Sequence, residues 1–215
     1  MDQAEQLNTI AQNSKGMPGA EPIHNAIDQF SKAFNPKNAI QVGDQFPDFI
    51  LRDATGKTVS KTDLLAQGPL LITFYRGQWC PYCNVALQFL QRHLDDFTAK
   101  GVSLVAMTPE LPDYSLTTAE KNELRFPVLT DLHNEVARKL GIVYDQSCAR
   151  DVFDKLGVSL AERNGDGSFE VPIPATLLVD KDGVVRNVYV EPDYRKRMDP
   201  KLALEWIDNM SSNQV

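Results

Sequence analysis

Two cysteines three positions apart are the residues of this sequence best suited to chemistry. Cys80 and Cys83 enclose a Cys-Pro-Tyr-Cys segment. A continuous apolar run from Leu70 to Phe74 predicts a buried strand before it, and apolar residues at helical spacing predict a helix that begins within it. Pro81 suits the first helical position, since its missing N–H would be unpaired there. The helix N-terminus favours a thiolate at Cys80, and Cys83, one turn later, is within reach of a disulfide.

The same two cysteines fit two other uses less well. Buried, inert cysteines are one such use, but Trp79 and Pro81 beside the pair favour a shaped, partly exposed turn. A zinc site is the other, and it needs two further ligands. Cys148, His93 and His133 supply no second closely spaced pair. The spacing after a strand favours a redox-active pair, for which we expect no metal, flavin or nucleotide cofactor.

The composition excludes several classes of protein. The chain has 215 residues, of which 42% are hydrophobic and 24% charged, so it is not wholly disordered. Its net charge of −7 opposes contact with phosphate backbones, and we expect no nucleic-acid partner. The longest apolar runs fall far short of the ~20 residues that span a bilayer, and no secretory signal is visible. We therefore expect no membrane association and a cytoplasmic location, where three cysteines are too few for a disulfide scaffold.

Strand and helix patterns alternate from residue 41 onward. Continuous apolar runs predict buried strands, and Thr-Gly and Asp-Gly turns predict hairpins. Apolar residues at helical spacing predict helices, of which one is long and ends before Gly101. The strand patterns cover 53–59, 70–74, 102–107, 176–179 and 184–189, and the helix patterns cover 60–65, 87–97, 136–140 and 203–210. This alternation predicts an α/β fold, a three-layer α/β/α sandwich around a mixed sheet.

The sequence pattern of residues 1–40 predicts an N-terminal helical extension, which precedes a domain formed by residues 41–215. Apolar residues from Ile23 to Phe34 recur at helical spacing, and a weaker pattern near Leu7 predicts a second helix. Gly and Pro residues around Pro18 separate the two. An amphipathic arm of this kind can bury its apolar face on its own domain or in a homodimer contact. Packing on its own domain is the favoured prediction.

The cysteine segment resembles known redox sites. Trp-Cys-x-x-Cys after a strand is similar to thioredoxin, and Cys-Pro-Tyr-Cys is similar to the active-site tetrad of dithiol glutaredoxins. Over residues 41–190 the chain resembles the alkyl hydroperoxide reductase and thiol-specific antioxidant family, the peroxiredoxins and their relatives. The matching segments are Val42-Gly43-Asp44, Phe74-Tyr75, Phe126 to Asp131, and Pro174 to Asp180 with Asp182-Gly183. This resemblance implies a thioredoxin-like fold.

The resemblance includes departures at the reactive site. Peroxiredoxins carry Pro-x-x-x-Thr-x-x-Cys, which ends in the peroxide-reactive cysteine. In that alignment Arg76 stands at the Pro, Cys80 at the Thr and Cys83 at the reactive cysteine, while Pro174 stands at the family's arginine. The hydroxyl and guanidinium that contact the peroxide are both missing, and Arg76 is the candidate to supply positive charge instead. A Tyr-Arg-x-Arg segment that begins at Tyr194 resembles one in a peroxiredoxin-like subgroup, and it is either part of the site or a solvated basic patch.

Pro174 has a second interpretation, which follows from the resemblance to thioredoxin. There, Ile-Pro before a strand is the cis-proline loop that faces the active-site disulfide. The backbone at Ile173 is then expected to pair with an extended thiol substrate. Trp79, Pro81 and Tyr82 complete the predicted active-site loop.

The resemblance implies a thiol-based antioxidant enzyme, a peroxiredoxin-like peroxidase. A thiolate attacks a hydroperoxide and becomes a sulfenic acid, the second thiol condenses with it to form the Cys80–Cys83 disulfide, and a thioredoxin- or glutaredoxin-type dithiol restores both thiols. The peroxiredoxin alignment makes Cys83 the attacking sulfur, whereas the thioredoxin alignment makes it Cys80. Two alternatives are a general thiol–disulfide oxidoreductase and a non-enzymatic binding module switched by its disulfide. Cys148 is either a remote resolving thiol or an incidental surface cysteine.

Overall fold

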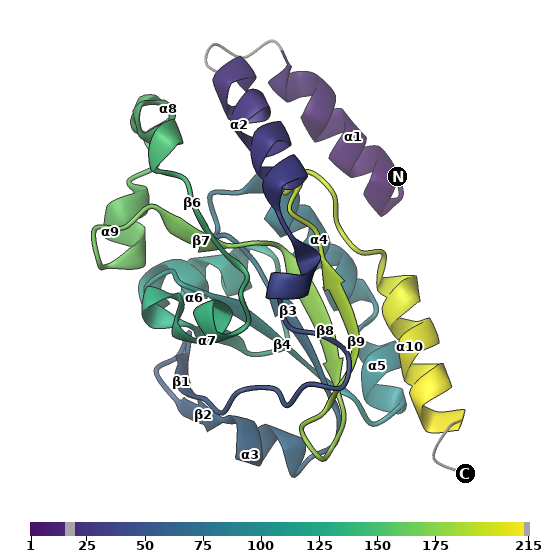
Figure 1. Cartoon of the computed structure of the whole chain (residues 1–215). Coiled ribbons are helices and arrows are strands. Elements are labelled where there is room, and N and C mark those ends of the chain that lie inside the picture. The colour runs from purple at the N-terminus through teal and green to yellow at the C-terminus, as the bar shows by residue number, and fades with distance from the viewer. Residues whose placement is uncertain (16–19, 213–215) are drawn as a thin grey trace.

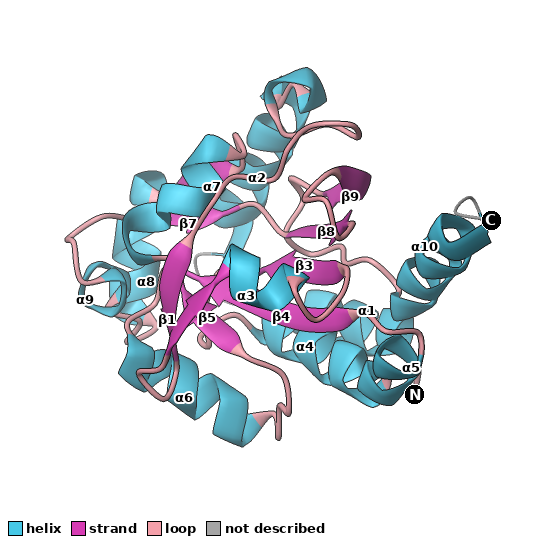
Figure 2. Cartoon of the chain, turned by 90° about the horizontal axis from the view of Figure 1, so that it is seen from below, coloured by secondary structure: helices cyan, strands magenta, loops and turns pink. Residues whose placement is uncertain are grey.

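A mixed sheet with helices on both faces forms the centre of the computed structural model, which describes residues 1–15 and 20–212 (Figures 1 and 2). The predicted α/β fold is confirmed. The helices are α1 (Gln3–Ser14), α2 (Ala20–Ala33), α3 (Lys61–Leu65), α4 (Pro81–Arg92), α5 (Leu94–Ala99), α6 (Pro112–Lys121), α7 (Glu135–Lys139), α8 (Arg150–Lys155), α9 (Leu160–Asn164) and α10 (Pro200–Ser212). The strands are β1 (Ile50–Asp53), β2 (Thr58–Ser60), β3 (Leu70–Phe74), β4 (Ser103–Thr108), β5 (Val128–Thr130), β6 (Val143–Asp145), β7 (Glu170–Pro172), β8 (Ala175–Val179) and β9 (Val185–Val190).

Seven of these strands form the main sheet, in the order β2-β1-β5-β4-β3-β8-β9. β3 pairs in parallel with β4 and antiparallel with β8, so it lies near the centre of the sheet. Every residue of β3 and β8 is buried, because helices cover both faces of the sheet at this point. Burial on both faces of the sheet explains why residues 70–74 and 175–179 form continuous apolar runs.

Two apolar clusters fill the spaces between the sheet and its helices. One includes Leu64 of α3 and Val136 of α7. The other includes Leu87 of α4, Phe97 of α5 and Ile207 of α10, on the opposite face (Figure 2). Both cysteines of the Cys-Pro-Tyr-Cys segment belong to this second cluster. Close packing of α4 against the sheet therefore holds the cysteine turn in place.

The long helix predicted after the cysteines is in fact two helices. His93, with φ −100° and ψ 6°, ends α4 and precedes α5. Asp95 and Asp96 lie in the first turn of α5, where negative charge stabilises a new helix N-terminus. Leu87 and Phe97 still face the same core, so the apolar periodicity continues across the break and did not reveal it.

The N-terminal arm, α1 and α2, packs on the rest of the chain (Figure 1). α1 lies against α4, and its Leu7 joins the same apolar cluster as the cysteines. The Gln3 side chain donates a hydrogen bond to the Met198 carbonyl oxygen at 3.0 Å. On α2, Asp28 forms an ion pair of 2.6 Å with Arg195. The predicted break between the two helices, around Pro18, lies outside the described residues.

A small second unit that the sequence patterns did not predict lies beside the arm. β6 and β7 pair with each other in a separate two-stranded sheet. Phe153, Leu160 and Phe169 form a cluster between this sheet, α8 and α9, and Trp79 packs against it. Its helices have only six and five residues, which is too short for apolar periodicity to identify.

Candidate active site

The cysteine turn has the geometry that the spacing predicted. β3 ends at Phe74, Cys80 is the N-cap residue of α4, and Pro81 occupies its first turn. Cys83 follows within that turn, and its backbone N–H donates to the Cys80 carbonyl oxygen at 3.0 Å. Both thiols are free. Each cysteine is only 1% exposed, so the prediction of a partly exposed turn holds for Trp79 and Pro81 but is wrong for the cysteines themselves.

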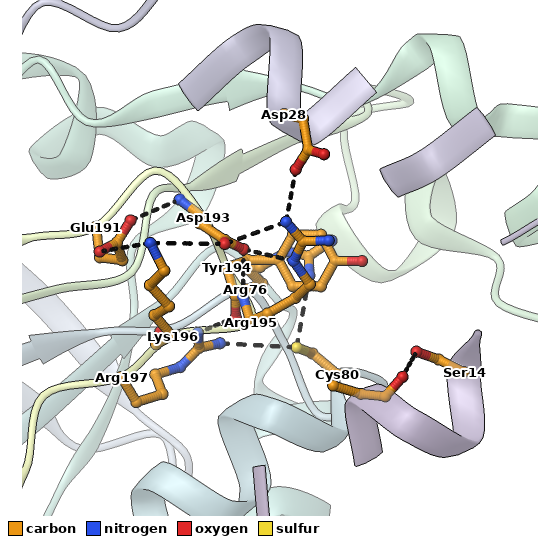
Figure 3. A network of polar contacts seen from close by, with 11 residues as sticks. Ser14, Asp28, Arg76, Cys80, Glu191, Asp193, Tyr194, Arg195, Lys196 and Arg197 are labelled. Atoms are coloured by element: carbon orange, nitrogen blue, oxygen red, sulfur yellow. Dashed lines mark hydrogen bonds and ion pairs between the residues drawn. The ribbon is translucent and has the colours of Figure 1, made fainter. Parts of the chain in front are cut away.

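Two guanidinium groups converge on the two sulfur atoms. Arg197 Nη2 lies 3.1 Å from Cys83 Sγ and 3.9 Å from Cys80 Sγ. Arg76 Nη1 approaches Cys80 Sγ from another side, at 3.6 Å (Figure 3). Neither arginine forms an ion pair with a carboxylate within the part of the chain that the structure describes. Their charge is therefore available to a thiolate.

These arginines and the contact between the two thiols make the cysteines unequal. Burial by itself raises the pKa of Cys83, but the hydrogen bond from Cys80 and the charges of Arg197 and Arg76 outweigh it and hold that pKa well below its usual value. At Cys80, burial and the neighbouring Cys83 raise the pKa well above its usual value. Of the two thiols, Cys83 is therefore the one whose thiolate the site favours.

Arg76 is held on three sides. Its Nη2 donates to Gln146 Oε1 at 2.5 Å. Its guanidinium carbon lies 4.5 Å from the centre of the Trp79 ring and 3.9 Å from the centre of the Tyr194 ring. Tyr82 in turn meets Tyr194 edge to face, with ring centres 5.6 Å apart. These contacts with two aromatic rings and a side-chain amide hold the Arg76 guanidinium in place beside Cys80.

The backbone before Cys80 is held by a buried carboxylate. Glu110, which is 0% exposed, accepts a hydrogen bond from the Gln78 N–H at 2.6 Å and an ion pair from Arg163 at 3.0 Å. Burial raises the pKa of Glu110, although these two contacts act in the opposite direction. Gly77 adopts φ +147°, and a Cβ there would lie 2.4 Å from Trp79 Nε1. Only glycine fits this turn without strain.

Each cysteine borders a different cavity. A pocket of about 300 Å³ borders Cys80 and is lined by residues of the N-terminal arm, the cysteine turn and the α8 region, most of them apolar. A crevice of about 20 Å³ on the other side borders Cys83, with Arg197 and Pro174 in its wall. Arg76, Trp79, Pro81 and Tyr82, the remaining residues of the predicted loop, all line the larger pocket.

The cis-proline interpretation of Ile173 and Pro174 is wrong. The peptide bond between them is trans. The Ile173 N–H donates to the Ile142 carbonyl oxygen at 2.6 Å, and the Ile173 side chain is buried in the core. Its N–H is therefore not free to pair with a substrate. The bond to Ile142 extends the contact between β6 and β7, and this explains why the chain stays extended here.

Three side chains that contact the cysteine turn or Arg76 lie far from the cysteines in sequence. Arg197 belongs to the Tyr-Arg-x-Arg segment, so the resemblance to a peroxiredoxin-like subgroup was a signal for it. Gln146 and Glu110 had no signal, since they reach the turn only through the fold.

Cys148 is exposed, and its neighbour across the loop is Tyr144. Within residues 1–15 and 20–212, no three His, Cys, Asp or Glu side chains gather as metal ligands. No helix in those ranges is long and apolar enough to span a bilayer.

Comparison with known proteins gives a consistent result. The model of the AhpC/TSA family matches residues 42–188. Peroxiredoxin Bcp of Escherichia coli K12 is 25% identical over 170 residues, which are 79% of this chain and 97% of that protein. Thiol-disulfide oxidoreductase ResA of Bacillus cereus is 23% identical over 153 residues, which are 71% of each. The crystal structure of peroxidoxin BcpB from Mycobacterium tuberculosis superposes with a TM-score of 0.63 at 21% identity, over 79% of this chain and 97% of that one.

Proposed function

This chain belongs to the AhpC/TSA family, and we propose that it is a thiol peroxidase in which Cys83 is the sulfur oxidised by the hydroperoxide. The Cys83 thiolate attacks one oxygen of the O–O bond, which breaks. The attacked oxygen stays on Cys83 with its hydrogen as a sulfenic acid, and the other oxygen leaves and takes up a proton from solvent, as water or an alcohol. The peroxiredoxin alignment also places Cys83 at the family's peroxide-reactive cysteine.

The contact between Arg197 and Cys83 carries this proposal. A guanidinium 3.1 Å from a sulfur stabilises the thiolate and afterwards the charge that develops on the leaving oxygen. Peroxiredoxins use a threonine hydroxyl and an arginine for this purpose, and Cys80 and Pro174 stand at those positions here. We propose that Arg197, on a different segment, supplies the charge that the family's arginine supplies elsewhere.

Cys80 is proposed as the resolving thiol. Its thiol attacks the Cys83 sulfenic acid, the sulfur–sulfur bond forms, and hydroxide leaves as water with the Cys80 proton. The raised pKa of Cys80 keeps that proton on the sulfur until this step. A dithiol reductant of the thioredoxin type then restores both thiols by exchange. Since such a reductant works in a reducing compartment, we propose the cytoplasm as the location.

A second candidate function is general thiol–disulfide exchange without peroxidase activity. The observation that favours it is the pocket of about 300 Å³ at Cys80, which is larger than a peroxide group needs. Reduction of insulin disulfides and consumption of hydrogen peroxide, measured on the same preparation, separate the two functions. We expect peroxide consumption to dominate, because the Arg197 guanidinium lies 3.1 Å from Cys83 and stabilises a thiolate there.

Two serine variants test which sulfur reacts with peroxide. We expect Cys80→Ser to keep one rapid oxidation by hydrogen peroxide and to stop at a sulfenic acid on Cys83, which dimedone traps for mass spectrometry. We expect Cys83→Ser to lose that oxidation. In the wild-type protein, peptide mapping after oxidation should find the Cys80–Cys83 disulfide. A sulfenic acid on Cys80 in the Cys83→Ser variant, with no oxidation of Cys80→Ser, would overturn the assignment of Cys83 as the peroxide-reactive sulfur, and a lack of oxidation in the wild-type protein would overturn the peroxidase proposal.

A further inference from the structure

The two cysteines line separate cavities. The crevice of about 20 Å³ borders Cys83 and has room for about one water-sized molecule, which suits a small peroxide. The pocket of about 300 Å³ borders Cys80 and is not lined by Cys83. Oxidation of Cys83 through the crevice thus leaves the large pocket without a use in the first half of the reaction.

The pocket is mostly apolar, and besides the cysteine turn two other parts of the chain line it. Ile10 and Ile23 of the N-terminal arm form one wall, and they lie outside the region 42–188 that the family model matches. Val152 and Leu156 form the other wall. Leu156 is 54% exposed, so an apolar surface continues from the pocket to solvent. Such a patch favours contact with an apolar group of another molecule.

The chemistry of disulfide reduction selects Cys80 as the sulfur to be attacked. A reductant thiolate must attack one sulfur and expel the other, and the sulfur with the more stable thiolate leaves faster. Cys80 has guanidinium nitrogens of Arg76 and Arg197 at 3.6 and 3.9 Å, but the shortest of these contacts, 3.1 Å from Arg197, is to Cys83, which makes Cys83 the better leaving group. The pocket gives the reductant thiol access to Cys80, and Arg197 stabilises the Cys83 thiolate that leaves. Both features therefore favour attack on Cys80.

We propose that the pocket at Cys80 binds the apolar group that flanks the attacking thiol of a dithiol reductant. The reductant thiolate bonds to Cys80 Sγ, the Cys80–Cys83 bond breaks, and Cys83 leaves as a thiolate beside Arg197. The second reductant thiol then attacks the reductant sulfur of this mixed disulfide, which closes the reductant's own disulfide and releases Cys80 to take up the proton. Two electrons pass from the reductant to the protein. This inference rests on the Cys80–Cys83 cycle proposed above.

The test compares two small thiols of similar acidity, benzyl mercaptan and 2-mercaptoethanol. The disulfide is first formed with diamide, so the result does not depend on peroxidase activity. We expect the wild-type disulfide to react about tenfold faster with benzyl mercaptan, because the pocket buries its ring. Mass spectrometry of the quenched reaction should find the benzyl adduct on Cys80.

Tryptophan substitutions connect the preference to the pocket. Val152→Trp should fill it and reduce the preference for benzyl mercaptan to about twofold or less. Ile23→Trp, on a different element, makes the same test if the first variant does not fold. Ile50→Trp is the matched control, since Ile50 is 74% exposed and does not line the pocket, and it should keep the wild-type preference.

Four results would overturn the proposal. The first is an equal reaction rate with the two thiols, and the second is a preference for benzyl mercaptan that survives both pocket variants. The third is a benzyl adduct on Cys83. The fourth is slower oxidation of the pocket variants by cumene hydroperoxide with an unchanged preference between the thiols. The last result would assign the pocket to an organic peroxide. Failure of hydrogen peroxide to oxidise the wild-type thiols would instead contradict the proposed function, and the diamide experiment would still report on the pocket.

Discussion

Arg197 contacts both sulfurs from a loop that follows Cys83 by 114 positions in the chain. We predict that Arg197→Met slows oxidation by hydrogen peroxide about 100-fold, since it removes a charged donor from the site of developing charge. Arg197→Lys should recover part of the rate, because it keeps the charge without the planar fork. Stopped-flow oxidation of the reduced protein measures both.

Lys196→Met is the matched control for these variants. Lys196 is the adjacent cation, its side chain is 64% exposed, and its ion pairs of 4.0 and 3.9 Å are with Glu191 and Asp193 rather than with a sulfur. Its substitution should leave the oxidation rate within about twofold, as is usual for an exposed charge. An equal loss in Lys196→Met and Arg197→Met would mean that the loop contributes only a general positive potential.

The unequal acidity of the two thiols predicts the pH dependence. The lowered pKa of Cys83 means that its thiolate forms at a lower pH than a free thiol's, so the oxidation rate should reach its plateau below the free pKa of about 8.5. The rate should fall as pH decreases through that pKa, since protonation removes the nucleophile. The far-ultraviolet absorbance of the thiolate, recorded against pH, should show one thiol titrating below the free value of about 8.5 and one above it. Two titrations near the free value would contradict the assignment.

The turn between β3 and α4 is the element that aligns the sulfurs with the arginines. Gly77→Ala should destabilise it, since φ is +147° and the new Cβ would lie 2.4 Å from Trp79 Nε1 and 2.8 Å from the Glu110 carboxyl carbon. We expect a loss of about 1–3 kcal/mol in the free energy of unfolding in urea, together with slower oxidation. Gly43→Ala is the control, because φ is +97° there but nothing lies within 4 Å of the added Cβ. A loss at Gly43 as large as at Gly77 would show that backbone strain alone, and not this close contact, is responsible.

Packing of the N-terminal arm contributes to the stability of the whole molecule. Ile27 of α2 is 3% exposed, and Ile27→Ala should reduce the free energy of unfolding by about 2–5 kcal/mol. Asp28→Asn removes a partly exposed ion pair with Arg195 and should cost less than about 1 kcal/mol. Because the arm packs on its own chain, the midpoint of urea unfolding should not change with protein concentration. A midpoint that rises with concentration would favour the homodimer alternative.

Features that depend on near neighbours in the chain were predictable from the residues alone. The apolar run 70–74 is a buried strand, Pro81 begins a helix, and Cys80 and Cys83 share its first turn, since each follows from propensity and spacing over a few positions. The division at His93 was not predictable, because the core-facing side chains on both sides keep one period.

The assignment of chemistry to the two cysteines depended on contacts between distant residues. The same ten residues from Phe74 to Cys83 fit a thioredoxin and a peroxiredoxin alignment equally. Arg197, 114 positions from Cys83, and Gln146, 70 positions from Arg76, distinguish the two sulfurs. Charge acts through space over a few ångströms, so it is the folding of distant segments onto one turn that lowers the pKa of Cys83 while that of Cys80 is raised.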